Sequence, residues 1–400
     1  DCRREASSAL SGSPDIWHIH NHSLGKNGIQ PQLVQRLAEA AERVLLQPHD
    51  FAEDGRPANY SLLREFLGDE LDSALYPFSG RVQYAVLNQR DRSFLRAAGV
   101  AREFVHLLPN AVPEVRPLDE PMGHPWSRLF IYPCRGIRRK NIGEFLLWSA
   151  LAEEGDRFAM TLAPKNPLAK PVYDEWVAFA GKLHLPVSFN IAVEWENDFE
   201  ENVARADALV TTSVAEGFGL AFMEPWLFGK PLCGRNLPEI TGDFAANGID
   251  LSNLYQSLRV PLSLLDRREL EQTVRSEMEA AYEQYSRSLT DADFCVAMNV
   301  LVQDDMVEFG ALNEAMQQRV ILQADQLDGL SLVDALPGRE RIDKNRAAVL
   351  AHYGLDAYGE RLFGFYNSLM QAEDASIEYA PASRLLDQFL KPERFNLLRT

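Results

Sequence analysis

The stretch Ala-Leu-Val-Thr-Thr-Ser-Val-Ala-Glu-Gly-Phe-Gly-Leu-Ala-Phe-Met-Glu-Pro-Trp, residues 208–226, passes from an apolar run through a glycine-containing turn into a segment with helical spacing. The apolar run 208–212 predicts a buried strand, and residues 220–228 predict a helix. Gly217 and Gly219 let the backbone of the turn approach a ligand closely. Free N–H groups at the start of such a helix favour an anion. The stretch therefore predicts a strand, a ligand-binding turn and a helix.

Strands and helices alternate on both sides of this stretch. The alternation runs through residues 14–108 and again through residues 129–233, and it is typical of parallel sheets with crossover helices. Between the two regions, residues 109–127 contain five prolines, which do not sit inside regular elements. The pattern after about residue 262 predicts mainly helices. We therefore predict an α/β fold of two Rossmann-like parallel-sheet domains that face a cleft, with a mainly helical C-terminal extension.

The prolines set the predicted domain limits. We place an N-terminal domain at residues 1–113, a linker at 114–128, a C-terminal domain at 129–265 and a helical region at 266–400. Residues 1–13 are polar and serine-rich and predict a tail. Ligands of open parallel sheets bind beyond the carboxyl ends of the strands, so the ligand is expected in the cleft.

The composition limits the classes of function. The 400 residues include 40 lysines and arginines against 58 aspartates and glutamates, a formal net charge of −18, which argues against general binding to nucleic acid or anionic membranes. No run of about 18 apolar residues occurs, so no transmembrane segment is expected. The four cysteines form no CxxC pair and signal neither a zinc site nor a disulfide framework. A cytoplasmic location is the simpler expectation.

Two glutamates, Glu216 and Glu224, lie eight residues apart around the turn. On a continuous helix this spacing places two side chains about two turns apart and about 80° apart around the axis, so both could address one elongated ligand. Carboxylates accept strong hydrogen bonds and suit the hydroxyl groups of sugars. The alternative from the residues alone is an ordinary turn with two solvated glutamates, and both interpretations stay open at this point.

The motif Glu216-Gly217-Phe218-Gly219 … Glu224 … Gly229-Lys230-Pro231 resembles the Glu-x7-Glu signature of retaining glycosyltransferases of family 4, which have the GT-B fold. Three further segments resemble that family in the expected order: Asp15–His20 its histidine strand, Leu108–Val112 its "IPNGV" segment, and Ile131–Asn141 its "VGRLxxxKN" segment. The resemblance covers roughly residues 14–242. It implies that the last helices pack partly back on the first domain, which would bind the acceptor.

The resemblance also implies roles for individual residues. Arg135 and Lys140 match the cationic pair that grips the nucleotide diphosphate, whose negative charge grows as the glycosidic bond breaks. Glu216 matches the residue that contacts the donor sugar, and Glu224 matches the one that holds the ribose hydroxyls. The diphosphate cradle matches the backbone of four residues: Gly217, Phe218, Gly219 and Leu220. Glu239, in a "PEI" segment, is either a ligand contact or a turn residue.

Three histidines alternate along the first predicted strand: His18, His20 and His22. If the strand stays extended, all three point to one face and could bind zinc. The resemblance instead implies that His20 contacts the transferred sugar without a metal. Asn21, His22 and His49 are possible acceptor-side residues. A strand end with surface histidines is the third interpretation.

The sequence thus predicts a retaining hexosyltransferase that uses a nucleotide-diphosphate sugar of the UDP-glucose or GDP-mannose type and an unknown acceptor. His20, Glu216, Arg135 and Lys140 are the expected catalytic residues, with no metal and no cofactor besides the donor. A homodimer is possible. The family's usual first strand and glycine-rich loop are not found before residue 15, so the first domain is expected to be shortened at its start. The alternatives are a non-catalytic sugar-nucleotide-binding protein and a metal-dependent hydrolase that uses His18 and His20.

Overall fold

The computed structural model describes residues 2–115, 123–327, 329–330, 336–373 and 376–399. The chain divides into two compact units. Unit 1 comprises residues 1–111, 279–289 and 355–394; unit 2 comprises residues 112–278, 290–354 and 395–400. Part of the predicted linker, residues 116–122, lies outside the described residues.

Unit 1 is built on a parallel sheet. Within the described residues its order is β1-β2-β4-β5, so the strands lie side by side in chain order. The strands are β1 (Trp17–His20), β2 (Val44–Gln47), β4 (Val82–Val86) and β5 (Val105–Leu107). Every side chain of β2 and β4 is buried, as expected of central strands covered on both faces.

Helices cover this sheet, and apolar side chains from both fill the core of unit 1. The helices are α2 (Ile29–Glu39), α3 (Pro57–Leu67), α4 (Leu71–Ala74), α5 (Gln89–Ala98), α16 (Leu355–Gln371) and α17 (Ala382–Phe389). A two-residue strand β14 (Glu378–Tyr379) pairs antiparallel with β3 (Pro77–Phe78). The predicted N-terminal tail is wrong over most of its length, because Cys2–Leu10 form helix α1. Its charged and small residues permit helical hydrogen bonding without a long apolar stripe.

Unit 2 contains a second parallel sheet, whose described strands run in the order β10-β9-β6-β7-β8. These strands are β6 (Arg128–Arg135), β7 (Asp156–Leu162), β8 (Val187–Ser188), β9 (Ala208–Thr211) and β10 (Leu232–Gly234). The chain runs outward from β6 through β7 to β8 and then returns to the other side of β6 with β9. The order therefore reverses between β6 and β9, where open α/β sheets bind their ligands.

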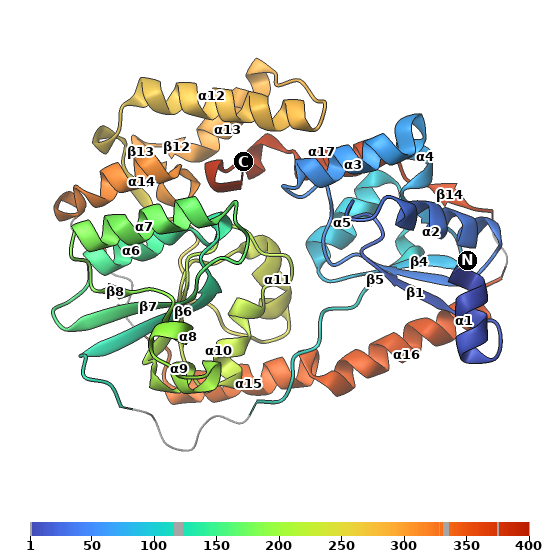
Figure 1. Ribbon diagram of the computed structural model, residues 1–400, viewed down its shortest axis with the longest axis horizontal. Helices are drawn as coiled ribbons and strands as arrows, with labels where there is room; N and C mark the ends of the chain where they lie inside the picture. Colours follow the sequence, from blue (N-terminus) through green and yellow to red (C-terminus); the bar gives the residue numbers. More distant parts are fainter. Residues whose placement is uncertain (1, 116–122, 328, 331–335, 374–375, 400) are drawn as a thin grey trace. The chain divides into compact units, whose positions relative to one another are not determined.

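The helices of unit 2 lie on both sides of its sheet, as Figure 1 shows. They are α6 (Ile142–Ala150), α7 (Lys170–Lys182), α8 (Ile191–Glu194), α9 (Phe199–Arg205), α10 (Glu224–Leu227), α11 (Pro238–Ala246), α13 (Asp291–Leu301), α14 (Glu314–Ile321) and α15 (Arg339–Tyr353). Helix α14 packs on α6, and α15 packs on α10. Helix α12 (Arg267–Gln284) carries the chain from unit 2 into unit 1.

The region after residue 262 is not only helical. Strands β12 (Val302–Gln303) and β13 (Met306–Glu308) form a hairpin, and β13 also pairs antiparallel with β11 (Arg259–Pro261). The turn of the hairpin contains Asp304 and Asp305 with positive φ, a conformation that aspartate tolerates. Such short strands give too few alternating residues for a sequence pattern to reveal them.

The core of unit 1 buries the carboxyl group of Glu53, which is only 1% exposed. Its Oε1 accepts a hydrogen bond of 2.8 Å from the Tyr76 hydroxyl. Burial disfavours the charged form and raises the pKa of Glu53 to about 8. The folded protein therefore keeps this proton over a pH range in which the unfolded chain releases it.

We predict that the free energy of unfolding falls between about pH 4.5 and pH 8 because of Glu53. In that window the folded state binds more protons than the unfolded state, so stability declines as pH rises. Glu53→Gln removes this dependence. From pH 5 to pH 8, the unfolding free energy of Glu53→Gln should therefore rise relative to that of the native protein by on the order of 2–4 kcal/mol. Urea denaturation at both pH values measures the difference. Exposed Glu65→Gln is the matched control, and parallel pH responses of native protein and Glu53→Gln would refute the prediction.

Candidate functional site

Two loops leave unit 2 at the same edge of its sheet. One follows β6 and contains a 3-10 turn, η3 (Arg138–Lys140); the other follows β9 and contains Glu216. Because β6 and β9 are neighbouring parallel strands, their carboxyl ends lie side by side. The sheet order alone therefore brings together two segments that are about 75 residues apart in the chain.

Hydrogen bonds fasten the two loops to each other. The Val214 amide donates to the Arg139 carbonyl at 3.0 Å. The Thr212 hydroxyl lies 3.0 Å from the Lys140 carbonyl and 3.1 Å from the Asn141 carbonyl. Thr212 is fully buried, so these bonds are shielded from competing water. The backbone around Lys140 is thus fixed relative to the strand that precedes Glu216.

The Lys140 ammonium group forms an ion pair with the Glu216 carboxylate. The two side chains are only 13% and 10% exposed, so solvent screens the pair weakly. Burial raises the pKa of Glu224, and the charge of Lys140 opposes that shift. Lys140 therefore acts electrostatically on both glutamates of the motif. The structure brings together Lys140, Glu216 and Glu224.

Arg135 is the last residue of β6 and is half-buried. Its guanidinium makes no hydrogen bond or ion pair with any residue that the structure describes. The neighbouring Arg138 differs, because it forms a two-pronged ion pair with Glu314 at 2.6 and 3.0 Å. Of these two arginines, only Arg135 leaves its charge available to a ligand at the carboxyl edge of β6.

The predicted helix over residues 220–228 is wrong. The chain forms a 3-10 turn, η4 (Leu220–Phe222), and then a separate short helix, α10. Pro225 has no N–H group and disfavours helical geometry in the residue before it, which prevents one continuous helix. Glu224 is therefore the first residue of α10 rather than a residue two turns into a helix. What links the two glutamates is Lys140, which pairs with Glu216 and acts electrostatically on Glu224, rather than helical spacing. Because no continuous helix begins at the turn, the predicted contribution of a helix dipole does not apply.

The turn between the two glutamates is shaped by its buried side. The Phe218 ring packs against Phe244 and Tyr353, with ring centres 5.8 and 6.1 Å away. Gly219 has φ +93°, and a Cβ at this position would lie 2.8 Å from Ile240 Cγ2, so only glycine suits it. Phe218 and Gly219 thus fix the shape of the turn, while Leu220 is partly exposed. Glu239 is exposed on the first turn of α11.

In unit 1 the histidines His18, His20 and His22 do not all share one face, because His22 departs from the other two. Strand β1 ends at His20, and Asn21 takes a left-handed conformation with φ +55°. His22 is consequently buried, where its Nε2 lies 3.1 Å from the Leu75 carbonyl and its ring contacts Tyr76. The acceptor-side role for His22 is therefore wrong, since its ring has no access to a ligand. Asn21 has a structural contact, because its Oδ1 accepts from the His49 amide at 2.7 Å.

His18, His20 and His49 form a row of stacked rings. His20 Nδ1 lies 2.9 Å from His49 Nε2, and the rings of His18 and His20 stack at 4.5 Å. His18 Nδ1 lies 2.8 Å from the Tyr366 hydroxyl and its Nε2 lies 2.9 Å from Gln47 Oε1. Burial lowers the pKa of His18 to about 4, and the pKa values of His20 and His49 are lowered for the same reason. Of these three histidines, only His20 is exposed.

Both ring nitrogens of His18 are therefore engaged by protein groups, which leaves none for a metal ion. Among the residues that the structure describes, no group of three or more histidine, cysteine, aspartate or glutamate side chains is arranged to hold a metal. In the same part of the chain, no helix combines the length and the apolar character needed to cross a bilayer.

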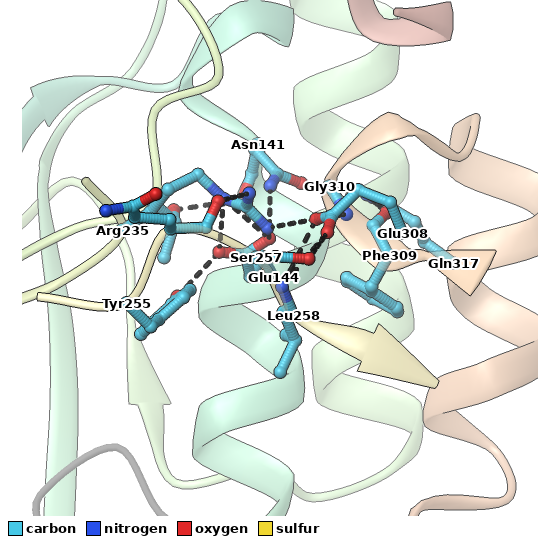
Figure 2. A network of polar contacts seen from close by, with 12 residues as sticks. Asn141, Glu144, Arg235, Tyr255, Ser257, Leu258, Glu308, Phe309, Gly310 and Gln317 are labelled. Carbon is cyan, nitrogen blue, oxygen red and sulfur yellow. Dashed lines mark hydrogen bonds and ion pairs between the residues drawn. The ribbon is translucent and has the colours of Figure 1, made fainter. Parts of the chain in front are cut away.

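A largely buried polar network begins at Asn141, the residue after Lys140, and the sequence does not predict it. Figure 2 shows it: Asn141 bonds to Glu144, Glu144 to Arg235 and Tyr255, and Arg235 to Glu308. Burial alone would lower the pKa of Arg235, but the carboxylates of Glu144 and Glu308 raise it above its usual value. A glutamate in a predicted helix and an arginine after a predicted strand give no signal that they meet, because such residues are ordinarily solvated.

No protein-family model matches the sequence. A curated relative, mannosylglucosyl-3-phosphoglycerate synthase of Petrotoga mobilis, is 24% identical over an alignment that covers 96% of this chain and 81% of that protein. Among solved structures, HepE of Anabaena in complex with UDP and glucose matches with a TM-score of 0.50 and 11% identity, over 91% of this chain and 81% of that one. Sucrose-phosphate synthase of Thermosynechococcus elongatus matches with a TM-score of 0.49 and 12% identity, over 92% and 77%.

The alignment with the Petrotoga mobilis protein and the match to HepE each cover more than 90% of this chain. The predicted α/β fold with two parallel-sheet domains of the GT-B type is confirmed. The comparisons indicate a glycosyltransferase.

We predict that His18 stays neutral throughout the physiological pH range. Burial and the neighbouring imidazoles disfavour its charged form, so its NMR titration should have a midpoint near pH 4. Because the unfolded chain binds this proton at higher pH, the histidine contributes a loss of stability as pH falls from about 6.5 to 4. A His18 midpoint at or above pH 6.5, the ordinary value for histidine, would contradict the burial argument.

Proposed function

We propose that the protein transfers a hexose from a nucleotide-diphosphate sugar to an acceptor with retention of anomeric configuration. The observation that carries this proposal is the contact between Lys140 and Glu216 at the reversal of the strand order in unit 2. A diphosphate needs fixed cations, and a sugar needs carboxylate acceptors for its hydroxyl groups. Both chemical groups meet at the edge of the sheet where such ligands bind.

In this proposal the cations bind the diphosphate. Arg135, which has no anionic partner in the described part of the chain, supplies one charge, and Lys140 supplies the second. The backbone of the turn at Gly217–Leu220 lies along the diphosphate. Glu216 contacts the donor sugar. Glu224, whose burial raises its pKa, accepts hydrogen bonds from the ribose.

The proposed reaction proceeds on one face of the sugar. The bond between the anomeric carbon and the diphosphate oxygen breaks, and the acceptor oxygen forms its bond to that carbon from the same side. The departing diphosphate oxygen takes the proton of the acceptor hydroxyl, so no further base is required. Arg135 and Lys140 stabilise the charge that develops on the leaving group. The remaining contribution is the orientation of donor and acceptor.

The name of the curated relative guides the choice of substrates. Its product contains a mannosyl and a glucosyl group on 3-phosphoglycerate. We therefore propose GDP-mannose and UDP-glucose as the first donors to test, with glucosyl-3-phosphoglycerate among the first acceptors. His20 is the proposed contact of unit 1 with the transferred sugar, because it alone in the row of stacked rings is exposed.

We predict opposite effects of two substitutions on the binding of free UDP or GDP. Lys140→Ala should weaken binding about 10- to 100-fold, because it removes a charged contact to the diphosphate. Glu216→Gln should leave binding unchanged or strengthen it, because the carboxylate no longer competes for the Lys140 ammonium group, yet it should lower sugar transfer about a hundredfold. Calorimetry measures the binding, and product formation measures the transfer.

Lys182→Ala serves as the matched control, since Lys182 is exposed at the end of α7, away from the carboxyl edge of the sheet. Equal binding by the native protein, Lys140→Ala and Lys182→Ala would refute the site. Donor binding without turnover of any acceptor would favour a non-catalytic sugar-nucleotide-binding protein. Stoichiometric zinc in the purified protein would favour the hydrolase.

A further inference from the structure

The residue after Lys140 has an unusual backbone and a fully engaged side chain. Asn141 takes a left-handed conformation, with φ 52° and ψ 60°, and is 1% exposed. Its Nδ2 donates to Glu144 Oε2 at 2.8 Å, and its Oδ1 accepts from Gln317 Nε2 at 2.8 Å. Glycine would adopt this backbone at no steric cost, so the conformation by itself does not require asparagine. The amide group is what distinguishes Asn141 from glycine.

One partner of that amide, Glu144, is itself fixed. Its carboxylate is fully buried and accepts bonds of 2.9 and 2.6 Å from two nitrogens of Arg235. The Tyr255 hydroxyl donates to Glu144 Oε1 at 2.6 Å. A carboxylate with this many donors in a buried site has one orientation, because any rotation leaves a charged group without a partner.

Arg235 is fixed from its other side as well. Its Nη2 donates to Glu308 Oε1 at 2.6 Å, and Glu308 in turn bonds to the Ser257 hydroxyl and the Gly310 amide. A Cβ on Gly310 would lie 2.5 Å from Arg235 Nη2, so the backbone of β13 and its following turn closes over the guanidinium. The chain of contacts in Figure 2 therefore runs from Glu308 in the three-stranded sheet through the buried side chains of Arg235 and Glu144 to Asn141.

The backbone on either side of the Lys140–Asn141 peptide is held from the opposite direction. Thr212 bonds to both carbonyls, and Thr212 belongs to the loop that leads to Glu216. The backbone at Lys140 and Asn141 is therefore held by the Thr212 hydroxyl, from the loop after β9, and by Glu144 through the Asn141 amide. This leaves only the side-chain torsions to place the ammonium group.

We propose that Asn141 is a positioning residue for Lys140: its amide, held by Glu144 and Gln317, fixes the backbone from which Lys140 reaches Glu216 and the diphosphate. The inference deepens the proposed function, on which its consequence for the diphosphate rests. Asn141 touches no reacting atom in this account and acts through Lys140 alone. It follows that its contribution to ligand binding disappears when Lys140 is absent.

The test is a double-mutant cycle with Asn141→Gly and Lys140→Ala, read by calorimetry with UDP and GDP. Glycine keeps the left-handed backbone and removes only the amide. Asn141→Gly alone should weaken binding roughly 3- to 30-fold, and in the Lys140→Ala background it should cause no further loss. His184→Gly is the control, because it replaces another residue with φ 52° in unit 2 and should change neither value. Equal losses in both backgrounds would overturn the inference.

A second measurement needs no nucleotide. Reductive ¹³C-methylation of the lysines keeps their charge and gives each an NMR signal, with that of Lys140 identified by its loss in Lys140→Ala. Asn141→Gly should move this signal toward its position in Glu216→Gln, where the ammonium group has lost its carboxylate partner. An unmoved signal would also overturn the inference. If native protein binds neither nucleotide, the proposed function fails, while this signal still decides the role of Asn141.

Should Asn141→Gly lower the thermal midpoint so far that the protein does not fold, Gln317→Leu takes its place. This change removes one of the two side-chain bonds of Asn141 and keeps the volume of the buried site. It must show the same dependence on Lys140. An additive effect with Lys140→Ala would count against the inference as directly as in the first cycle.

Discussion

The parallel pairing of β6 with β9 is the constraint on which the candidate site depends. Chain order would place β7 and β8 after β6, but the fourth strand returns to the other side, so that the loops after β6 and β9 emerge together. One loop brings the cation of Lys140 and the other the carboxylate of Glu216. Without that pairing the two charged groups would lie on different parts of the sheet, and each would be an ordinary surface residue.

The site shows how buried polar groups can define a position rather than add stability. Replacing an ion pair such as Glu144–Arg235 with apolar side chains is often neutral or stabilising in proteins, so its presence is weak evidence for a gain in stability. The pair gives the Glu144 carboxylate a single orientation, and this carboxylate accepts the hydrogen bond from the Asn141 side-chain amide. The neighbouring arginines differ: Arg138 forms an ion pair with Glu314, whereas Arg135 has no ion pair within the described part of the chain and is the arginine proposed to bind the diphosphate.

The histidines of unit 1 illustrate a different limit on a polar site. Stacked imidazoles that share hydrogen bonds cannot all take up a second ring proton and become charged, because each charge would repel the next and burial penalises every one of them. The row therefore acts as neutral donors and acceptors. Such groups suit a hydroxyl-bearing ligand better than an anionic one.

The sequence by itself determined the alternation of strands and helices, the two parallel sheets and the candidates Lys140 and Glu216, because periodicity and short motifs depend on neighbours along the chain. It could not determine that Pro225 divides the helix after Gly219 or that His22 turns into the core after Asn21, although single residues cause both. Only the tertiary structure decided that Asn141, Glu144, Arg235 and Glu308 meet. Arg235 lies 91 positions from Glu144 and 73 positions from Glu308 in the chain, and a local pattern carries no information about such distant partners.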